Sequence, residues 1–436
     1  MFPKLMVLLA APVMLGAQQV TDTTLHPISL AEAIRLAGDK NVSNIIANNS
    51  VRSSNNAVRQ ARAAFIPNVS VSAGQSRSSG ERLGQNNTII GFGSAWSYNT
   101  GLSINNFTLF DGGKMFADIK TANANVAAAE AGEVNTEFSV ALQVKLAYNS
   151  ILAAKESEGA ALAQLEVAKV QLQTSIAKVN AGAANVSDSL RSVVQVGTAQ
   201  LALLQAQNLY RTSAAALTRL VGTPYFVTAQ LADTIERPPT PVDSAVVLQE
   251  ALNGPGIRQQ EATVTATSAA LRSAKTAYLP TVTAGFSLGG SGTSAIYGFN
   301  NNPYPYARTF NVSLNYPLFN RFQRENNIAT QQISLENAQA SLKDQQLGAQ
   351  QNIITAIATI RNAEETMRVQ QINVEASQED LRVQQQRYNL GASVLLDVLN
   401  SESALVTARQ QLIQARLNYR NARAQIEAYI GKDLPQ

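Results

Sequence analysis

The chain has 436 residues, of which 45% are hydrophobic and only 15% charged, with a formal net charge of +4, no Cys and one His. These counts exclude disulfides, thiolate nucleophiles, Cys-zinc sites and multi-histidine metal centres, so we expect no cofactor. The charged fraction lies below the ~25% usual in soluble proteins, and Asn, Gln, Ser, Thr and Ala fill the gap. The absence of a basic cluster argues against nucleic acid as a partner.

The N-terminus has the pattern of a secretory signal peptide. Lys4 precedes the apolar run Leu5–Met14, and small residues follow up to Ala17. The run is shorter than the ~20 residues of a membrane-spanning helix, so we expect residues 1–17 to be removed during export. The mature chain then either stays in the periplasm or crosses the outer membrane as strands.

The chain contains an internal duplication. Three short segments each recur 209 residues later in the chain. For example, Gly182 of one segment corresponds to Gly391, and 391 − 182 = 209. The matched pairs are Asn180–Ala183 with Asn389–Ala392, Leu109–Asp111 with Leu318–Asn320, and Arg219–Gly222 with Ala428–Gly431. A unit of this length is too long for a solenoid repeat, so each copy is half of the structure. We expect the copies at 18–221 and 243–436, joined by an ordered linker, 222–242, that runs along the outside.

Each copy is expected to begin with a helix that ends at a proline. The first helix opens with capping-box spacing at Ser29 and runs to about Phe65, two residues before a proline that disfavours further helix. Its counterpart runs from about Asp243 to Pro280, with an interruption at the sequence NGPG, Asn253–Gly256.

Two strands are expected after each proline, at about 67–76, 95–110, 280–289 and 306–318. Apolar residues alternate with small or polar ones, so each strand has one apolar and one polar face. If the apolar faces meet lipid, the sheet must close, and four strands are too few for a barrel. Several chains must then share the barrel, each supplying a quarter or a third of its wall. The alternative is a soluble β-sandwich, for which the strands are too few and too widely spaced.

A long coiled-coil hairpin is expected after each strand pair, at about 111–221 and 320–431. Asp111 and Asn320 stand where an N-cap is needed, because their side chains can accept amides of the first turn. Each outgoing helix would be about 100 Å long if continuous. Turns are expected at Gly182 and Gly391, where a helix reverses.

The helix that returns from the second turn carries apolar residues at intervals of seven, which is the spacing of coiled-coil packing. The stripe consists of Val398, Leu405, Leu412, Tyr419 and Ile426, and its copy in the first half of Val196, Leu203, Tyr210 and Leu217.

The whole mature chain resembles the TolC family of outer membrane efflux channels. The resemblance rests on the twice-repeated order of helix, strand pair and coiled-coil hairpin, and on five motifs. The motifs are Leu30–Ile34 (LAEAI), Ala64–Pro67 (AFIP), Ala277–Pro280 (AYLP), Leu109–Gly113 (LFDGG) and, most specific, Arg387–Leu399 (RYNLGASVLLDVL).

The resemblance implies a mainly α-helical homotrimer with a 12-stranded β-barrel in the outer membrane of a diderm bacterium and a 12-helix α-barrel in the periplasm. Such a channel exports small molecules or proteins in a tripartite efflux or type I secretion system. Its partners would be outer membrane lipid, a periplasmic adaptor protein and an inner-membrane RND, ABC or MFS pump. The alternative is a soluble periplasmic coiled-coil adaptor or scaffold. An enzyme is disfavoured, because the chain has no nucleophile with a nearby base and no Gly-x-Ser-x-Gly elbow.

The resemblance also assigns a pore gate. Asp397 lies six residues after Gly391 and matches the acid that constricts the pore in the family, so that three copies would form an acidic ring. Asn400 stands where the family often has a second acid, which argues for a single ring and against strong cation selectivity. The alternative for Asp397 is a solvated residue near a helix cap.

A second set of residues is expected to hold the pore closed. By resemblance, Tyr388 and Asp188 bond between coiled coils, and Ser393 replaces a basic residue that often assists, so this lock is expected to be weaker than in relatives. The alternative for Tyr388 is ordinary coiled-coil packing.

Two further groups complete the expected sites. The adaptor is expected to dock on the turns, at Gly182, Ala183, Gly391 and Ala392. An aromatic girdle at the membrane surface is expected from Trp96, Tyr98, Tyr304, Tyr306 and Tyr316.

Overall fold

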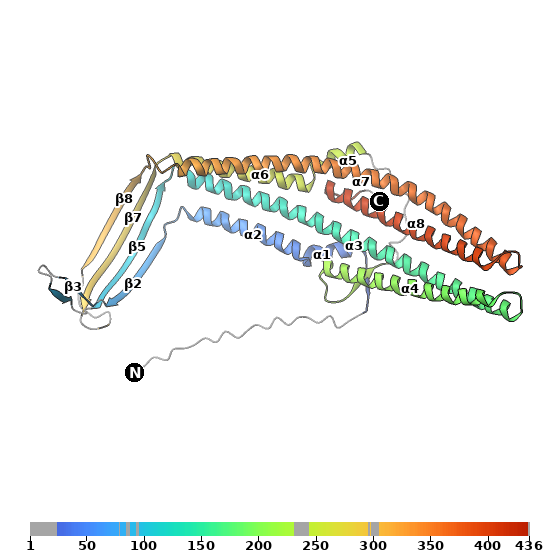
Figure 1. The fold of residues 1–436 in the computed structure, drawn as a ribbon. Helices are drawn as coiled ribbons and strands as arrows, with labels where there is room; N and C mark the ends of the chain where they lie inside the picture. The colour runs from blue at the N-terminus through green and yellow to red at the C-terminus, as the bar shows by residue number, and fades with distance from the viewer. Residues whose placement is uncertain are drawn as a thin grey trace. The chain divides into compact units, whose positions relative to one another are not determined.

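The computed structural model describes residues 24–77, 79–83, 88–92, 96–230, 244–294, 297 and 305–434. The expected signal peptide, Tyr304 and residues 231–243 lie outside the described residues. The chain divides into two compact units, shown within the ribbon of Figure 1. Unit 1 consists of Met1–Ile46, Asn135–Gly254 and Ala349–Gln436, and unit 2 of Ala47–Val134 and Pro255–Gly348. Both units take segments from both sequence copies, so the duplicated half is not itself a packing unit.

Unit 2 contains a four-stranded antiparallel sheet with the strand order β2-β5-β7-β8 (Figure 1). The strands are β2 (Val69–Arg77), β5 (Trp96–Phe110), β7 (Thr281–Ser294) and β8 (Tyr306–Asn315). Compared with the expected ranges, β7 extends five residues further, to Ser294, and β8 ends three residues earlier, at Asn315. Between β2 and β5 a small hairpin forms from β3 (Gly80–Leu83) and β4 (Ile89–Phe92), which sequence reasoning had treated as loop.

The strand register gives the sheet one mainly apolar face and one polar face. Ile104 lies opposite both Val69 and Phe286, and Phe286 lies opposite Phe310. The apolar face consists of Val69, Val71, Ala73, Gln75 and Arg77 on β2, Trp96, Tyr98, Thr100, Leu102 and Ile104 on β5, Val282, Ala284, Phe286, Leu288 and Gly290 on β7, and Tyr306, Arg308, Phe310, Val312 and Leu314 on β8. Val71 is 81% exposed and Phe310 70% exposed, whereas Tyr98 is only 2% exposed, so this face is open on both outer strands and covered at Tyr98.

The opposite, polar face carries only Ser, Thr, Asn, Gly and one Ala. Its members are Ser70, Ser72, Gly74 and Ser76 on β2, Ser97, Asn99, Gly101 and Ser103 on β5, Thr283, Gly285, Ser287, Gly289 and Ser291 on β7, and Ala307, Thr309, Asn311, Ser313 and Asn315 on β8. The alternation inferred from the sequence therefore extends over all four strands, with interruptions on β5 between Ile104 and Phe107 and between Thr108 and Phe110.

The two outer strands of this sheet, β2 and β8, each pair on one side only within the described residues. Their other sides present rows of backbone N–H and C=O groups without strand partners, which is the property that makes a sheet edge recruit another chain.

The first helix is not continuous to Phe65 as expected. It divides into α1 (Leu30–Lys40) and α2 (Val42–Ala63) at Asn41, whose backbone is extended. Asn41 Oδ1 accepts the amide of Ser43 at 2.9 Å, and Asn41 Nδ2 donates to the carbonyl of Leu220 at 2.8 Å. The break therefore depends on a contact across 179 residues of sequence. The expected interruption in the second copy is present, between α5 (Ser244–Ala251) and α6 (Pro255–Lys275).

The passages from strand to long helix have the same left-handed backbone in both copies. Gly112 and Gly113 have φ angles of 71° and 83°. The residues 209 positions later (321 − 112) are Arg321 and Phe322, with φ angles of 59° and 61°. A Cβ on Gly112 would lie 2.4 Å from the Cβ of Leu279, so a glycine is needed there. The second copy adopts the same backbone with ordinary side chains, at a cost of about 1–2 kcal/mol per residue.

The long helices have equal lengths in the two copies. The outgoing helices α3 (Lys114–Asn180) and α7 (Gln323–Asn389) have 67 residues each, and the returning helices α4 (Val186–Val221) and α8 (Leu395–Ile430) have 36 each. Asp111 Oδ2 accepts the amide of Met115 at 2.9 Å as expected. These equal lengths support the inferred duplication.

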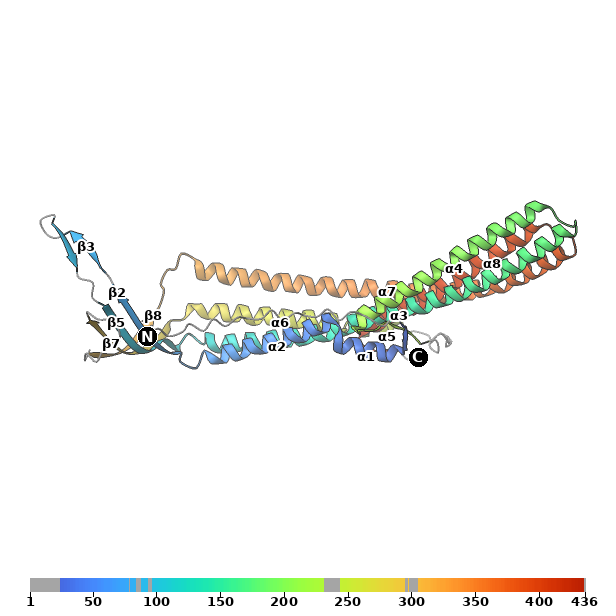
Figure 2. The same cartoon turned by 90° about the horizontal axis from the view of Figure 1, so that it is seen from below.

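In unit 1 the hairpins α3/α4 and α7/α8 lie side by side and turn at the same end (Figure 2). The stripe of sevens on α8 packs as predicted, because Val398, Leu405, Leu412 and Ile426 are all less than a tenth exposed. Ile426 belongs to a cluster with Ile353 and Ile360 of α7, which joins the two helices of this hairpin.

The expected outer linker is partly a buried strand. Val227–Ala229 form β6, which pairs in parallel with β1 (His26–Ile28), and all three residues of β6 are buried. Tyr148 of α3 fixes this small sheet by donating to the carbonyl of Ile28 and accepting the amide of Gln230, both at 3.1 Å. Val227–Ala229 therefore belong to the core of unit 1, and the interpretation of an outer linker was wrong for these three residues.

An ion cluster attaches the C-terminal turn to α3. Lys145 Nζ lies 2.7 Å from Glu427 and 2.6 Å from Asp433, and its side chain is only 13% exposed. Burial alone would lower the pKa of Lys145, but its hydrogen bonds to Asp433 and Glu427 raise it overall. None of the helices in the described part of the chain has the length and apolar character needed to cross a bilayer.

Candidate functional site

The two helical turns of unit 1 have the same geometry. Gly182 and Gly391 have φ of 69° and 77°, and the next residue in each turn donates its amide five residues back, Ala183 to Lys178 and Ala392 to Arg387, both at 2.8 Å. This is the Schellman bond that ends a helix with a left-handed glycine. We call 181–185 tip 1 and 390–394 tip 2. The glycines and alanines predicted for docking are all exposed.

Asp397 lies in the first turn of α8 and is exposed, as is Asn400 one turn further on. Its carboxylate accepts a hydrogen bond from Ser393 Oγ at 2.6 Å. Ser393, which was assigned to the lock, therefore stabilises the start of its own helix within the chain. Asp188 occupies the equivalent position on α4, since 397 − 188 = 209.

Tyr388 is a coiled-coil core residue of the second hairpin. It is 5% exposed and packs in one cluster with Leu381, Leu395, Val398 and Leu405. Its hydroxyl is buried and has no hydrogen-bond partner among the described residues. Within this single chain the expected bond to Asp188 is therefore not formed, and a bond to Asp188 of another chain stays a prediction.

A residue missed by sequence reasoning contacts Tyr388 from the other hairpin. Lys178 Nζ lies 3.7 Å from the centre of the Tyr388 ring and donates to the Tyr388 main-chain carbonyl. Burial lowers the pKa of Lys178. The sequence copy offered no clue, because the residue equivalent to Tyr388 in the first hairpin is Val179 (388 − 209).

A buried carboxylate forms a second contact between the hairpins. Glu402 of α8 is 1% exposed, and Gln164 Nε2 of α3 donates a hydrogen bond to its Oε1. Burial raises the pKa of Glu402, and the bond from Gln164 opposes this only in part. Burial therefore disfavours the charge on Glu402, and the hydrogen bond from Gln164 stabilises it.

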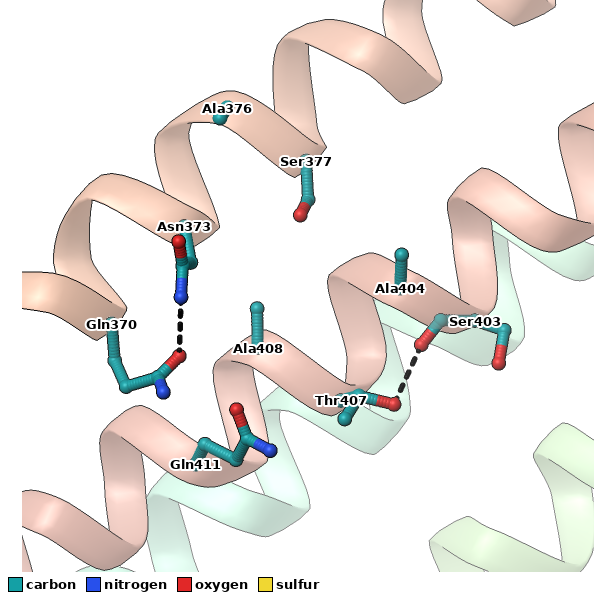
Figure 3. Close-up of a pocket in the computed structure, with 9 residues that line it drawn as sticks. All are labelled: Gln370, Asn373, Ala376, Ser377, Ser403, Ala404, Thr407, Ala408 and Gln411. Atoms are coloured by element: carbon teal, nitrogen blue, oxygen red, sulfur yellow. Dashed lines mark hydrogen bonds between the residues drawn. The ribbon is translucent and has the colours of Figure 1, made fainter.

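An open groove of about 380 Å³ lies along α7 and α8 and contains no titratable side chain (Figure 3). Asn373 bonds to Gln370 on one wall, and Thr407 to the carbonyl of Ser403 on the other. The remaining lining consists of small residues and one amide: Ala376, Ser377, Ala404, Ala408 and Gln411. Such a surface suits close approach of another helix rather than chemistry.

The described residues expected to form the aromatic girdle lie at two ends of the sheet, and one of them, Tyr98, is buried, with only 2% of its surface exposed. Trp96, Tyr98 and Tyr306 lie at the end away from the long helices, and Tyr316 follows β8 at the other end. Further exposed aromatics that sequence reasoning missed are Tyr297, whose ring lies 4.8 Å from that of Trp96, and Phe319 and Phe322, 5.4 Å from each other. Within the described residues, no group of three or more His, Cys, Asp or Glu side chains is placed to hold a metal.

Glu402 predicts a pH dependence of stability. The folded chain holds the proton of Glu402 more tightly than the unfolded chain does, so stability falls as pH rises from the ordinary value of 4.5 toward the raised pKa. Glu402→Gln keeps a partner for Gln164 and removes the buried charge. At pH values above this range the variant should therefore unfold at a higher temperature than wild type. At pH values well below 4.5 the two proteins should unfold at the same temperature, as measured by circular dichroism.

The matched control is Glu379→Gln, because the hydrogen bond from Arg382 lowers the pKa of the exposed Glu379. It should give no gain in unfolding temperature at neutral pH. If Glu402→Gln is less stable than wild type at neutral pH, interactions in the folded chain already offset the cost of burying the Glu402 charge, which contradicts this prediction.

Comparison with known proteins gives the family. The sequence model described as Outer membrane efflux protein matches residues 46–223 and 247–432. The chain is 27% identical over 348 residues to the pyoverdine export outer membrane protein OpmQ of Pseudomonas aeruginosa, covering 77% of this chain and 69% of that protein.

Solved structures share the fold. CusC aligns with a TM-score of 0.77 at 19% identity over 94% of both chains. The outer membrane protein VceC of Vibrio cholerae aligns with a TM-score of 0.73 at 19% identity over 93% of this chain and 96% of its own. The family match confirms the resemblance found in the sequence and rules out the soluble scaffold. The chain belongs to the outer membrane efflux protein family, and it is an outer membrane channel of an efflux or secretion system.

Proposed function

We propose that three copies of this chain form one export duct, with β8 of each copy paired to β2 of the next in a closed 12-stranded barrel. The observation that carries this proposal is the sheet itself: four strands with one exposed apolar face and two strand edges without partners. In a bilayer such edges must be paired, since lipid offers no hydrogen bonds. The long helices would continue as a 12-helix periplasmic tunnel.

The height of the apolar face supports this arrangement. Ten residues separate Tyr306 from Tyr316, which is about 34 Å along a strand and about 26 Å of height at a tilt of ~40°. Outer membrane barrels have an apolar band of about 25 Å between aromatic girdles. The two tyrosines would then mark the two surfaces of the bilayer.

The polar face would line the barrel. It carries no charged side chain and only small polar groups, so the wall has no feature that selects a particular cargo. We infer that the cargo is chosen by an inner-membrane pump of the RND, ABC or MFS class, and that an adaptor docks on tips 1 and 2. OpmQ is named for pyoverdine export, and small molecules are the cargo we favour here.

The narrowest point would be at the tips. Three copies of Asp397 around one axis would repel one another and attract cations, as a single ring without help from Asn400. The Lys178–Tyr388 contact ties the two hairpins of one chain together close to this ring. We propose that it favours the closed tip until an adaptor binds the open state more tightly.

Opposite faces of β8 should respond differently to a charge. Val312→Arg places a cation on the apolar face, at a cost of about 2–4 kcal/mol per chain if this face meets the bilayer core. Ser313→Arg is the matched control on the polar face. We expect the first to lose heat-resistant trimers from the outer membrane fraction and the second to keep them, with altered ion conductance. Equal behaviour of the two variants would contradict a barrel wall with this orientation.

Loss of the Lys178 contact should weaken the closed state. Lys178→Met keeps the aliphatic stem but loses the charge over the ring, a contact worth about 1–2 kcal/mol, so opening in planar bilayers should become roughly tenfold more frequent. Lys169→Met is the control, because Lys169 pairs with Glu166 on its own helix. Wild-type opening in Lys178→Met would remove the contact from the gate.

The variant Tyr388→Phe distinguishes the contact between Lys178 and the Tyr388 ring from the hydroxyl bond to Asp188 that the family resemblance implies. It keeps the ring under Lys178 and removes the hydroxyl that a bond to Asp188 of another chain requires. Increased opening in this variant would therefore assign part of the closed state to that bond.

A further inference from the structure

The four-stranded sheet contains two charged residues, and both are arginines. Arg77 ends β2 and Arg308 lies near the start of β8, while β2, β5, β7 and β8 contain no Asp or Glu. Both arginines belong to the apolar face, because Arg77 lies opposite Trp96 and Arg308 opposite Leu288. A surface that meets lipid is an unfavourable place for a cation, so each arginine needs a partner.

Arg77 has its partner within the chain, since its guanidinium lies 5.5 Å from the centre of the Trp96 ring. Arg308 differs. Its neighbours on the face are Tyr306 and Phe310 along the strand and Leu288 across it, and it makes no ion pair with a described residue. Its side chain is exposed.

Closing the barrel would not supply a counter-charge for Arg308. The strand that would pair with β8 is β2 of the next copy, and the apolar face of β2 carries Val69, Val71, Ala73, Gln75 and Arg77. None of these is acidic. The acid next along the chain is Glu81 of β3, four residues beyond Arg77. The four-stranded wall itself therefore offers Arg308 no counter-charge.

The level of Arg308 in the membrane indicates what this partner is. It lies two residues from Tyr306, about 5 Å below the girdle in height, and eight residues from Tyr316, about 21 Å from the other girdle. At this depth the long side chain can extend to the headgroup layer while its stem stays among apolar groups. The end of the sheet concerned is the one away from α3 and α7.

We propose that Arg308 binds the phosphate of a lipid headgroup in the leaflet farther from the periplasmic tunnel, with one such site on each chain. This inference rests on the proposed barrel. The guanidinium offers a planar pair of donors that matches two phosphate oxygens, and the lipid tails cover the apolar residues beside it. Phosphate-bearing lipid is the occupant that satisfies both the cation and the face around it.

The test is native mass spectrometry of the purified, delipidated full-length protein titrated with phosphatidylglycerol. Wild type should bind the lipid with up to one tight site per chain, and Arg308→Gln should bind about tenfold more weakly, since a charge-assisted hydrogen bond is lost. Arg308→Lys, which keeps the charge but loses the paired donors, should be intermediate. Arg59→Gln, the same change at an exposed position of α2, should match wild type.

Two competitors define the ligand. A galactosyl diacylglycerol, which has no phosphate, should not bind at this site, and inorganic phosphate should not displace the bound phosphatidylglycerol. Equal lipid affinity in Arg308→Gln and wild type, equal binding of the phosphate-free lipid, or displacement by inorganic phosphate would each overturn the inference. The same spectra report the number of chains, so an intact trimer with unchanged lipid affinity rejects this site alone, and failure to form trimers rejects the proposed duct.

Discussion

The structure depends on the unsatisfied backbone groups along β2 and β8. An exposed apolar face directs the sheet into lipid, and lipid offers no hydrogen bonds to those two edges. The chain cannot satisfy both demands alone, because four strands are too few to close on themselves. Assembly with further copies is thus a condition for placing this sheet in a membrane. In the proposed barrel the helices follow the strands, because every copy that joins the wall would bring two hairpins with it.

The duplicated sequence explains why so much of the fold could be inferred from periodicity. Two patterns reflect packing within one or two neighbouring elements. One is the alternation of apolar and polar residues from Phe310 to Leu314, and the other is the seven-residue spacing of apolar residues from Val398 to Ile426. Such patterns are local and survive in a sequence read alone. The same is true of the two tips, where a glycine with positive φ follows directly from the geometry of a helix end.

The parts that could not be inferred depend on contacts between distant segments. Asn41 interrupts the first helix because its amide reaches Leu220, and the short strands β1 and β6 exist because Tyr148 joins them. Arg321 and Phe322 adopt a backbone for which the first copy uses two glycines, so their residue types gave no sign of it. In each case tertiary structure overrides the local preference of the chain.

The candidate site shows the same division. Asp397 and Gly391 lie at the exposed end of the second hairpin, and Gly182 lies at the exposed end of the first. The partners of Tyr388 and Glu402 are Lys178 and Gln164, which lie on the other hairpin and in the other sequence copy. A motif confined to one hairpin cannot reveal such partners. Together these contacts describe a tip whose two hairpins are tied within one chain, and the sheet of the other unit carries no charge on its polar face.

The most direct test of this account is a cross-link between the two sheet edges. The chain has no Cys, so Ser72→Cys on β2 and Asn311→Cys on β8 introduce the only two thiols, both on the polar face. A cross-linker shorter than the ~14 Å across the four strands of one sheet can join only β8 of one copy to β2 of another. The account predicts a ladder of linked products in the outer membrane that ends at three chains. Products that remain at one chain, or that continue beyond three, would contradict it.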